Sequence, residues 1–155
     1  MLVLPEDDHS RQFANGFILH AAVAQRSLQI LPPAGGWMKA VERLEGHYFK
    51  TMERYPERRL VLVIDFDGEP VGRRTLVQDK TPTSLRPRVF VLGAYQEPEV
   101  LCAALGQTAE QVGEGLARGC AEQDLELWQH ERLRHNEGER QRLDQRVRGI
   151  LFPGL

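Results

Sequence analysis

Short apolar runs alternate with longer stretches of helical periodicity along this chain. Four of the runs are predicted to be strands: residues 2–4, 27–31, 59–65 and 88–93. The third holds five consecutive aliphatic residues, Leu60 to Ile64, a pattern typical of a strand that is buried on both faces. Pro5 ends the first run, and Asp65-Phe66-Asp67-Gly68 follows the third.

The segments between these strands carry apolar residues three and four positions apart, which is the spacing of one helix face. The first helix is expected to begin at Asp8 or Ser10, because both residue types cap helices. Its predicted apolar face consists of Phe13, Phe17, Ile18 and Ala21. A second helix is expected after Gly35-Gly36 and before Tyr55-Pro56. Its predicted apolar face consists of Trp37, Val41, Leu44, Tyr48 and Met52.

The rest of the chain is read in the same way. Residues 69–88 contain three prolines and mixed charge, and are predicted to form a long irregular connection. A helix is expected from Glu97-Pro98-Glu99 to Gly106, and Thr108 to Gln111 have the spacing of a capping box that opens another. From residue 124 onward the chain is expected to be helical and polar, with a sparse apolar stripe.

Strands that alternate with helices predict a three-layer α/β fold. We expect a mostly parallel four-stranded sheet with helices on both faces, joined by right-handed crossovers, and C-terminal helices in addition. The chain has 155 residues, which is the size of one domain. Residues 1–155 are therefore predicted to be a single domain, with 124–155 as a C-terminal helical extension.

Composition narrows the class of protein. The formal charge is -2, so the chain lacks the broad basic field of a free-standing nucleic-acid binder. No apolar run approaches the roughly 20 residues that span a bilayer, and the first residues do not resemble a signal peptide. The chain is expected to be cytoplasmic, with Cys102 and Cys120 as buried, reduced thiols.

Acidic residues follow three of the predicted strands. In a parallel sheet all carboxyl ends lie at one edge, which is where open α/β sheets bind ligands. Asp65 and Asp67, two residues apart on an extended chain, point to the same side. The other acidic residues expected at this edge are Glu6, Asp7, Asp8, Glu97 and Glu99. Carboxylates brought together in this way favour Mg²⁺ or Mn²⁺, ions that commonly act on phosphate groups.

Several residues are candidates to bind a phosphate beside these carboxylates. Gly35 and Gly36 precede a helix whose backbone N–H groups could contact an anion, and Lys39 lies in its first turn. A basic cluster is expected near the same edge, formed by Arg73, Arg74, Lys80, Arg86 and Arg88. Four arginines between residues 140 and 148 form a second candidate segment for phosphate contact.

The pattern of Glu6 after the first strand, followed by Asp65 and Asp67 after a later hydrophobic strand, resembles the Toprim family. That fold is shared by topoisomerases, bacterial primases, recombination proteins and nucleases of the overcoming-lysogenization-defect group. Small stand-alone Toprim-like proteins of bacteria and their mobile elements look most similar, over roughly residues 1–100. The resemblance departs at Asp7, where Toprim domains usually have glycine.

The resemblance implies Mg²⁺ (or Mn²⁺) held by Glu6, Asp65 and Asp67, with Glu6 as general acid or base. The implied activity is phosphodiester chemistry on nucleic acid, as in a nuclease. The alternative is a non-catalytic Toprim-like subunit of a nucleic-acid-processing complex, which would act through a protein partner or as a homodimer. Membrane association is not expected.

Two other classes of protein would use one or both of the same aspartates. A phosphatase of the haloacid-dehalogenase type would use Asp65 as nucleophile and Asp67 as acid or base, but no acidic pair follows a later strand in the manner that this class requires. A receiver domain needs a lysine after its fifth strand, and no lysine follows Lys80. His130 and His135 are five residues apart rather than four, so they do not form a zinc motif on one helix face.

Overall fold

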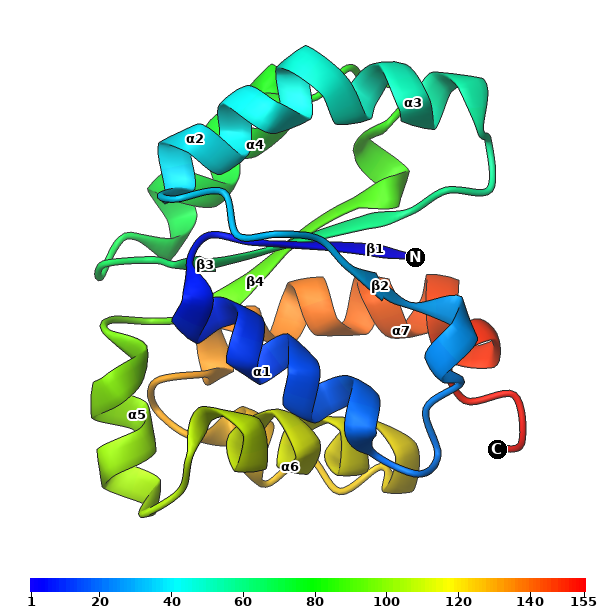
Figure 1. Cartoon of the computed structure of the whole chain (residues 1–155). Helices are drawn as coiled ribbons and strands as arrows, with labels where there is room; N and C mark the ends of the chain where they lie inside the picture. Colours follow the sequence, from blue (N-terminus) through cyan, green and yellow to red (C-terminus); the bar gives the residue numbers. More distant parts are fainter.

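The computed structural model describes all 155 residues, and four parallel strands form its centre (Figure 1). The strands are β1 (Leu2–Pro5), β2 (Gln29–Ile30), β3 (Leu60–Asp65) and β4 (Val89–Ala94). The helices are α1 (Asp8–Leu19), α2 (Trp37–Arg43), α3 (Phe49–Arg54), α4 (Pro70–Lys80), α5 (Pro98–Leu105), α6 (Ala109–Glu122) and α7 (Glu137–Leu151). None of these helices combines the length and the hydrophobicity of a membrane-spanning segment.

The sheet has the order β2-β1-β3-β4, with every neighbouring pair parallel. Leu2 is aligned with Leu60, and Leu60 is aligned with Val89. The predicted four-stranded parallel sheet is therefore confirmed. Strand β2 is shorter than the apolar run at 27–31 predicts, because Gln25–Ser27 forms a 3₁₀ turn before it.

Helices cover both faces of the sheet, as the sequence predicts (Figure 1). One face packs on α2, α3 and α4, with Leu4, Leu62, Val41, Met52 and Val77 in its apolar core. Helices α2 and α3 are joined through a π-helical turn, Leu44–Tyr48, so the predicted second helix runs from Trp37 to Arg54. The other face is covered by α1 and α7, and α6 lies beyond them, farther from the sheet.

Helices α1 and α6 touch through glycine. A Cβ atom at Gly16 would lie 1.9 Å from the carbonyl oxygen of Glu110, and one at Gly113 would lie 2.1 Å from that of Phe13. No side chain fits at either position, so the backbones meet directly. The closest packing of α1 is thus against α6 rather than against the sheet.

Three local predictions are wrong. Residues 69–88 are not irregular, because Pro70–Lys80 forms α4, with Pro70 at the start and Val77 buried beneath it. Proline suits the first helical turn, where its missing N–H is not needed. The cap of α1 is Asp7, whose side chain accepts the Ser10 N–H at 2.8 Å, rather than Asp8 or Ser10. Ala21 lies beyond the end of α1 and is exposed.

The C-terminal segment packs on the rest of the domain. Residues 124–136 form turns and two short 3₁₀ segments rather than a continuous helix, and α7 follows. Val147, Leu151 and Phe152 of α7 share a core with Val3 and Phe90 of the sheet. The segment predicted as an extension therefore supplies one of the covering helices. The helix that ends at Gly106 and the capping box at Thr108 are confirmed, and the structure adds that Gly106 is in the αL conformation.

Candidate functional site

The candidate site lies where the strand order reverses. From β1 the chain passes to β2 on one side, whereas β3 pairs with the other side of β1. The crevice beyond the carboxyl ends of two such strands is the usual ligand site of open α/β sheets. Glu6 follows β1 and Asp65 ends β3, so the two predicted carboxylates stand at this point.

Glu6 is held by two neighbouring segments, strand β3 and the turn at Gly35-Gly36. Its side chain accepts the backbone N–H of Asp65 at 2.7 Å, and its own N–H donates to the Val63 carbonyl at 2.8 Å. Its carbonyl oxygen accepts N–H groups from Gly35 at 2.8 Å and Gly36 at 3.0 Å. These two glycines have φ angles of +89° and +139°, which other residues rarely adopt. The two amides fix Glu6, so they are not available for a phosphate, contrary to the prediction.

Asp65 and Asp67 form the turn that leaves β3. The Asp65 carboxylate accepts the Asp67 N–H at 2.8 Å, and Asp67 has a φ of +50° ahead of Gly68. Aspartate is one of the few residues that tolerates this conformation. Asp65 is half-buried, whereas the Asp67 side chain is exposed. The turn therefore presents two carboxylates in different environments.

Burial raises the pKa of both inner carboxyl groups. For Glu6, removal from water is the main cause, and the charges of Asp7 and Asp65 raise its pKa further. For Asp65, burial is again the main cause, with the Asp67 charge acting in the same direction. The Asp65 N–H and Arg73 oppose the shift at Glu6 without cancelling it. A cation between the two groups would relieve this repulsion.

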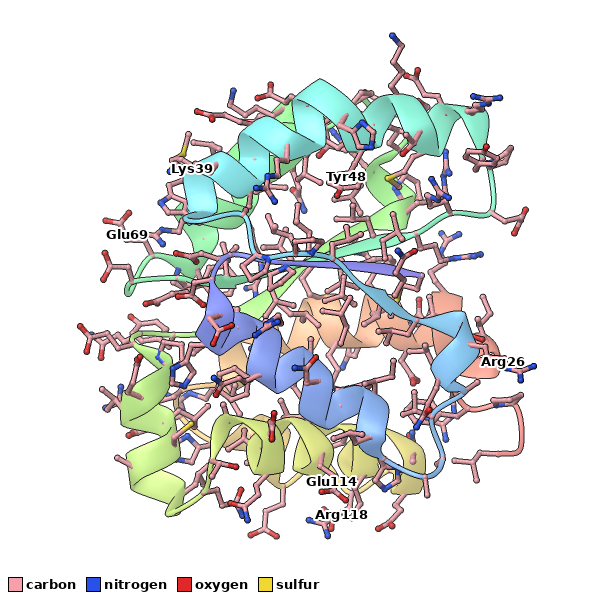
Figure 2. The ribbon with its side chains drawn as sticks, in the orientation of Figure 1. Arg26, Lys39, Tyr48, Glu69, Glu114 and Arg118 are labelled. Atoms are coloured by element: carbon pink, nitrogen blue, oxygen red, sulfur yellow. The ribbon has the colours of Figure 1, made fainter.

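Arg73 is the one predicted phosphate ligand that lies inside this site. It donates to the carbonyl oxygen of Asp65 and lies 3.4 Å from a carboxylate oxygen of Asp67. Its guanidinium stacks 4.5 Å from the centre of the Trp37 ring. Lys39 is exposed, and Figure 2 shows it and Glu69 on the same edge of the molecule. The site thus contains one fixed cation, Arg73, and Lys39 is an exposed cation at the same edge.

Arg74 does not belong to the site. Its three nitrogen atoms donate to the Val91 carbonyl at 3.2 Å, the His135 carbonyl at 2.7 Å and the Asn136 side chain at 2.8 Å. The guanidinium also stacks on Phe66, at 4.5 Å from the ring centre. It therefore joins α4 to the C-terminal turns, and its assignment to a phosphate is corrected.

The remaining predicted basic residues are also engaged elsewhere. Lys80 binds Glu45, Arg86 binds the Thr81 carbonyl, and Arg88 binds three carbonyls around residues 52–58. Because α4 runs away from the carboxyl edge, these residues reach the opposite edge of the sheet. The predicted cluster is therefore dispersed.

The arginines of α7 mainly bind carboxylates and carbonyl groups of the same chain. Arg140 binds Glu137, and Arg142 binds Glu139 and two carbonyls near the start of β4. Arg148 binds Asp144 and two carbonyls of α6. Of the four arginines between 140 and 148, only Arg146 is exposed. This segment offers little free positive charge to a phosphate.

The outer acidic residues surround the site rather than enter it. Asp7 caps α1, and Asp8 pairs with Arg11. Glu97 precedes α5 and is exposed. Glu99 lies 3.0 Å from the Nδ1 atom of His9, whose Nε2 atom is 3.9 Å from the thiol of Cys102. Both cysteines are free and only partly buried rather than fully enclosed.

The donor set fits a magnesium ion that is only partly held by protein. No three His, Cys, Asp or Glu side chains lie close enough together to bind one metal ion. Mg²⁺, however, is commonly bound by one or two carboxylates, with waters and substrate phosphates completing its coordination. Glu6 and Asp65 are two such carboxylates, and their raised pKa values reflect a charge that a cation would stabilise. Asp67, turned toward Arg73, lies outside this pair.

Comparisons with protein-family models, curated proteins and solved structures found no match to this chain. The Toprim resemblance therefore stays a prediction. What the structure establishes is the class of fold, a three-layer α/β protein with a parallel sheet.

Sequence reasoning missed two parts of this region. One is the stacking of Arg73 on Trp37. Arg73 was expected in a loop, and Trp37 was expected on the apolar face of a helix. The other is the group formed by Arg74, His135 and Asn136 beside Gly93. Gly93 indicates close packing at this point of β4, because a Cβ there would lie 1.6 Å from the Ile64 carbonyl oxygen, but it does not indicate the three side chains. A glycine inside a buried strand indicates such a close approach.

Proposed function

We propose that this protein carries out Mg²⁺- or Mn²⁺-dependent phosphodiester chemistry on nucleic acid, in the cytoplasm, at the Glu6–Asp65 site. The observation that supports this most directly is the position of two half-buried carboxylates at the reversal point of a parallel sheet. Their mutual repulsion favours a divalent cation, which would neutralise charge on phosphoryl oxygens.

Each residue has a distinct part in this proposal. Glu6 and Asp65 would hold the ion, and Glu6, with its raised pKa, is the group suited to give or take a proton. Asp67 faces solvent, where it would add negative charge near the ion, and it orients Arg73. Arg73 and Lys39 are the cations available to a phosphate at this edge.

A cleavage assay tests the proposal. Purified protein is incubated with circular single- and double-stranded DNA and with RNA, in Mg²⁺, Mn²⁺ or chelator. Wild-type protein should cleave only with metal, and Asp65→Asn should lose at least a hundredfold in rate. Asp8→Asn is the matched control, because Asp8 is exposed nearby and pairs only with groups of its own helix. Equal cleavage by Asp65→Asn and wild type would contradict the assignment.

A second candidate is a non-catalytic subunit of a nucleic-acid-processing complex. The inward orientation of Arg74, Arg140, Arg142 and Arg148 favours it, because few arginines are free to bind a phosphate backbone. Such a subunit would depend on a protein partner, or on a second copy of itself, to contact nucleic acid. Metal binding by calorimetry without cleavage of any substrate would support this candidate over the first.

A further inference from the structure

A cavity lies on the side of the sheet opposite α2, α3 and α4. Its volume is about 120 Å³, and 20 of the 27 residues around it are hydrophobic. The wall is formed by the sheet, α1, α6, α7 and the turn at Trp128. Representative wall residues are Val3, Val63, Leu92, Phe17, Leu143 and Trp128.

The exposed fractions of the strand side chains agree with unfilled space between the sheet and the helices on this side. Val63 and Leu92 lie opposite each other in the carboxyl halves of β3 and β4, on a face that helices cover, yet both are only partly buried. On the other face of the same strands, Leu62 is fully buried and Val91 is 3% exposed. On the cavity side itself Val61 is 3% exposed and Phe90 is fully buried, so the looser packing is confined to the carboxyl halves of β3 and β4.

The packing of α1 explains the gap. Helix α1 meets α6 at the backbone distances that Gly16 and Gly113 allow. Between α1 and the strands the contacts are made by side chains, and Ala14, one of the residues facing the cavity, has only a methyl group. A close contact on one side of α1 is thus matched by unfilled space on the other.

The amide and charged side chains of the wall already have partners, and the Ser10 hydroxyl is the polar group of the wall without one. Asn136 binds the Gly93 and Leu133 carbonyls, Arg140 binds Glu137, and Arg148 binds Asp144 and two carbonyls. A ligand would therefore find apolar surface with few free hydrogen-bonding groups. Apolar cavities of roughly 150 Å³ stay dry and take up benzene or xenon.

We propose that this cavity is a binding site for a small apolar molecule, with the size of one aromatic ring or a short alkyl chain. The site is separate from the carboxylates of Glu6 and Asp65, and it does not depend on the function proposed for them. Its ligand is recognised by volume and apolar surface rather than by charge.

Benzene is the probe for the test. The full chain carrying Trp37→Phe retains Trp128 as its only tryptophan, and Trp128 lines the cavity. Benzene is titrated while the fluorescence of Trp128 and the amide NMR shifts are followed. We expect saturable, reversible binding, with the largest shifts at Val63, Leu92 and Leu143.

Variants that fill the cavity test the location. In the same Trp37→Phe background, Val3→Ile with Val63→Ile, and separately Leu143→Phe, should weaken benzene binding at least tenfold while the melting temperature does not fall. Val41→Ile, on the other face of the sheet, should change the dissociation constant less than twofold. Xenon, followed by its own NMR signal in wild-type protein, gives a measurement that needs no variant. The proposal is overturned if neither benzene nor xenon binds saturably. It is also overturned if the variants that fill the cavity fold and bind benzene as tightly as the Trp37→Phe protein does.

Discussion

Replacing Val63 with isoleucine should stabilise this protein. Val63 lies on β3, it is only partly buried, and its side chain lines the cavity beneath α1. Isoleucine adds one methylene group and keeps the β-branched shape that strands favour. The new group should enter empty space rather than displace a neighbour.

The size of the effect follows from the cavity. An unfilled cavity costs about 24 cal/mol per Å³, so 120 Å³ corresponds to about 3 kcal/mol, which is the most that complete filling could recover. One buried methylene group contributes about 0.8 kcal/mol. Val63→Ile should therefore raise the free energy of unfolding by about 0.8 kcal/mol. In a domain of this size that is a rise of about 2–3 °C in melting temperature.

Urea unfolding followed by circular dichroism measures the change, with the melting temperature from calorimetry as a second reading. Val41→Ile is the matched control, because it makes the same chemical change at a residue that is 1% exposed in the other core. Overpacking there should cost about 1–3 kcal/mol. If Val63→Ile destabilised the protein as much as Val41→Ile does, the space beneath α1 would have to be filled, and the reasoning would fail.

Two further predictions concern pH and helix packing. Burial and, after it, the charge of Arg74 lower the pKa of His135 from 6.5 to about 4. Between pH 4 and pH 6.5 the unfolded chain therefore binds a proton that the folded chain does not. The free energy of unfolding should therefore fall as pH decreases from 6.5 to 4. Glutamine in place of His135 keeps a donor for the Gly93 carbonyl but does not titrate. In His135→Gln the midpoint of urea unfolding should accordingly depend less on pH over this range. Gly113→Ala should separate α1 from α6 and lower the free energy of unfolding by about 1–3 kcal/mol. Gly138→Ala is the control, because a Cβ at this position of α7 meets open space and should not lower stability. Equal stability of the two variants in thermal melts would disprove the contact between α1 and α6.

The sheet could be predicted because its signal is local. Runs such as Leu60 to Ile64 are too apolar for any position but a buried strand, and alternation with helices requires parallel pairing. The same logic placed Glu6 beside Asp65, since strands that run the same way end at one edge. Helix α4 was missed because its exposed face dominates its composition, and only Val77 in it is buried.

The direction of the arginine side chains could not be predicted. Arg73 and Arg74 are adjacent in sequence, yet one faces the carboxylates and the other binds carbonyl groups of β4 and residue 135. Backbone carbonyls are present at every residue, so the sequence contains no mark of which ones an arginine will meet. The cavity likewise leaves no pattern, because it depends on the distances between packed layers.

The position of α7 has a consequence for how the chain folds during synthesis. Residues 137–151 cover a face of the sheet whose first strand is residues 2–5, and the Ala24 N–H donates to the Leu151 carbonyl at 2.7 Å. Until α7 has left the ribosome, only α1 and α6 can cover that face, and the part of the core that Val147, Leu151 and Phe152 complete stays open. The nascent chain therefore carries an exposed apolar surface until residues 137–151 are released, a state prone to aggregation and suited to chaperone binding.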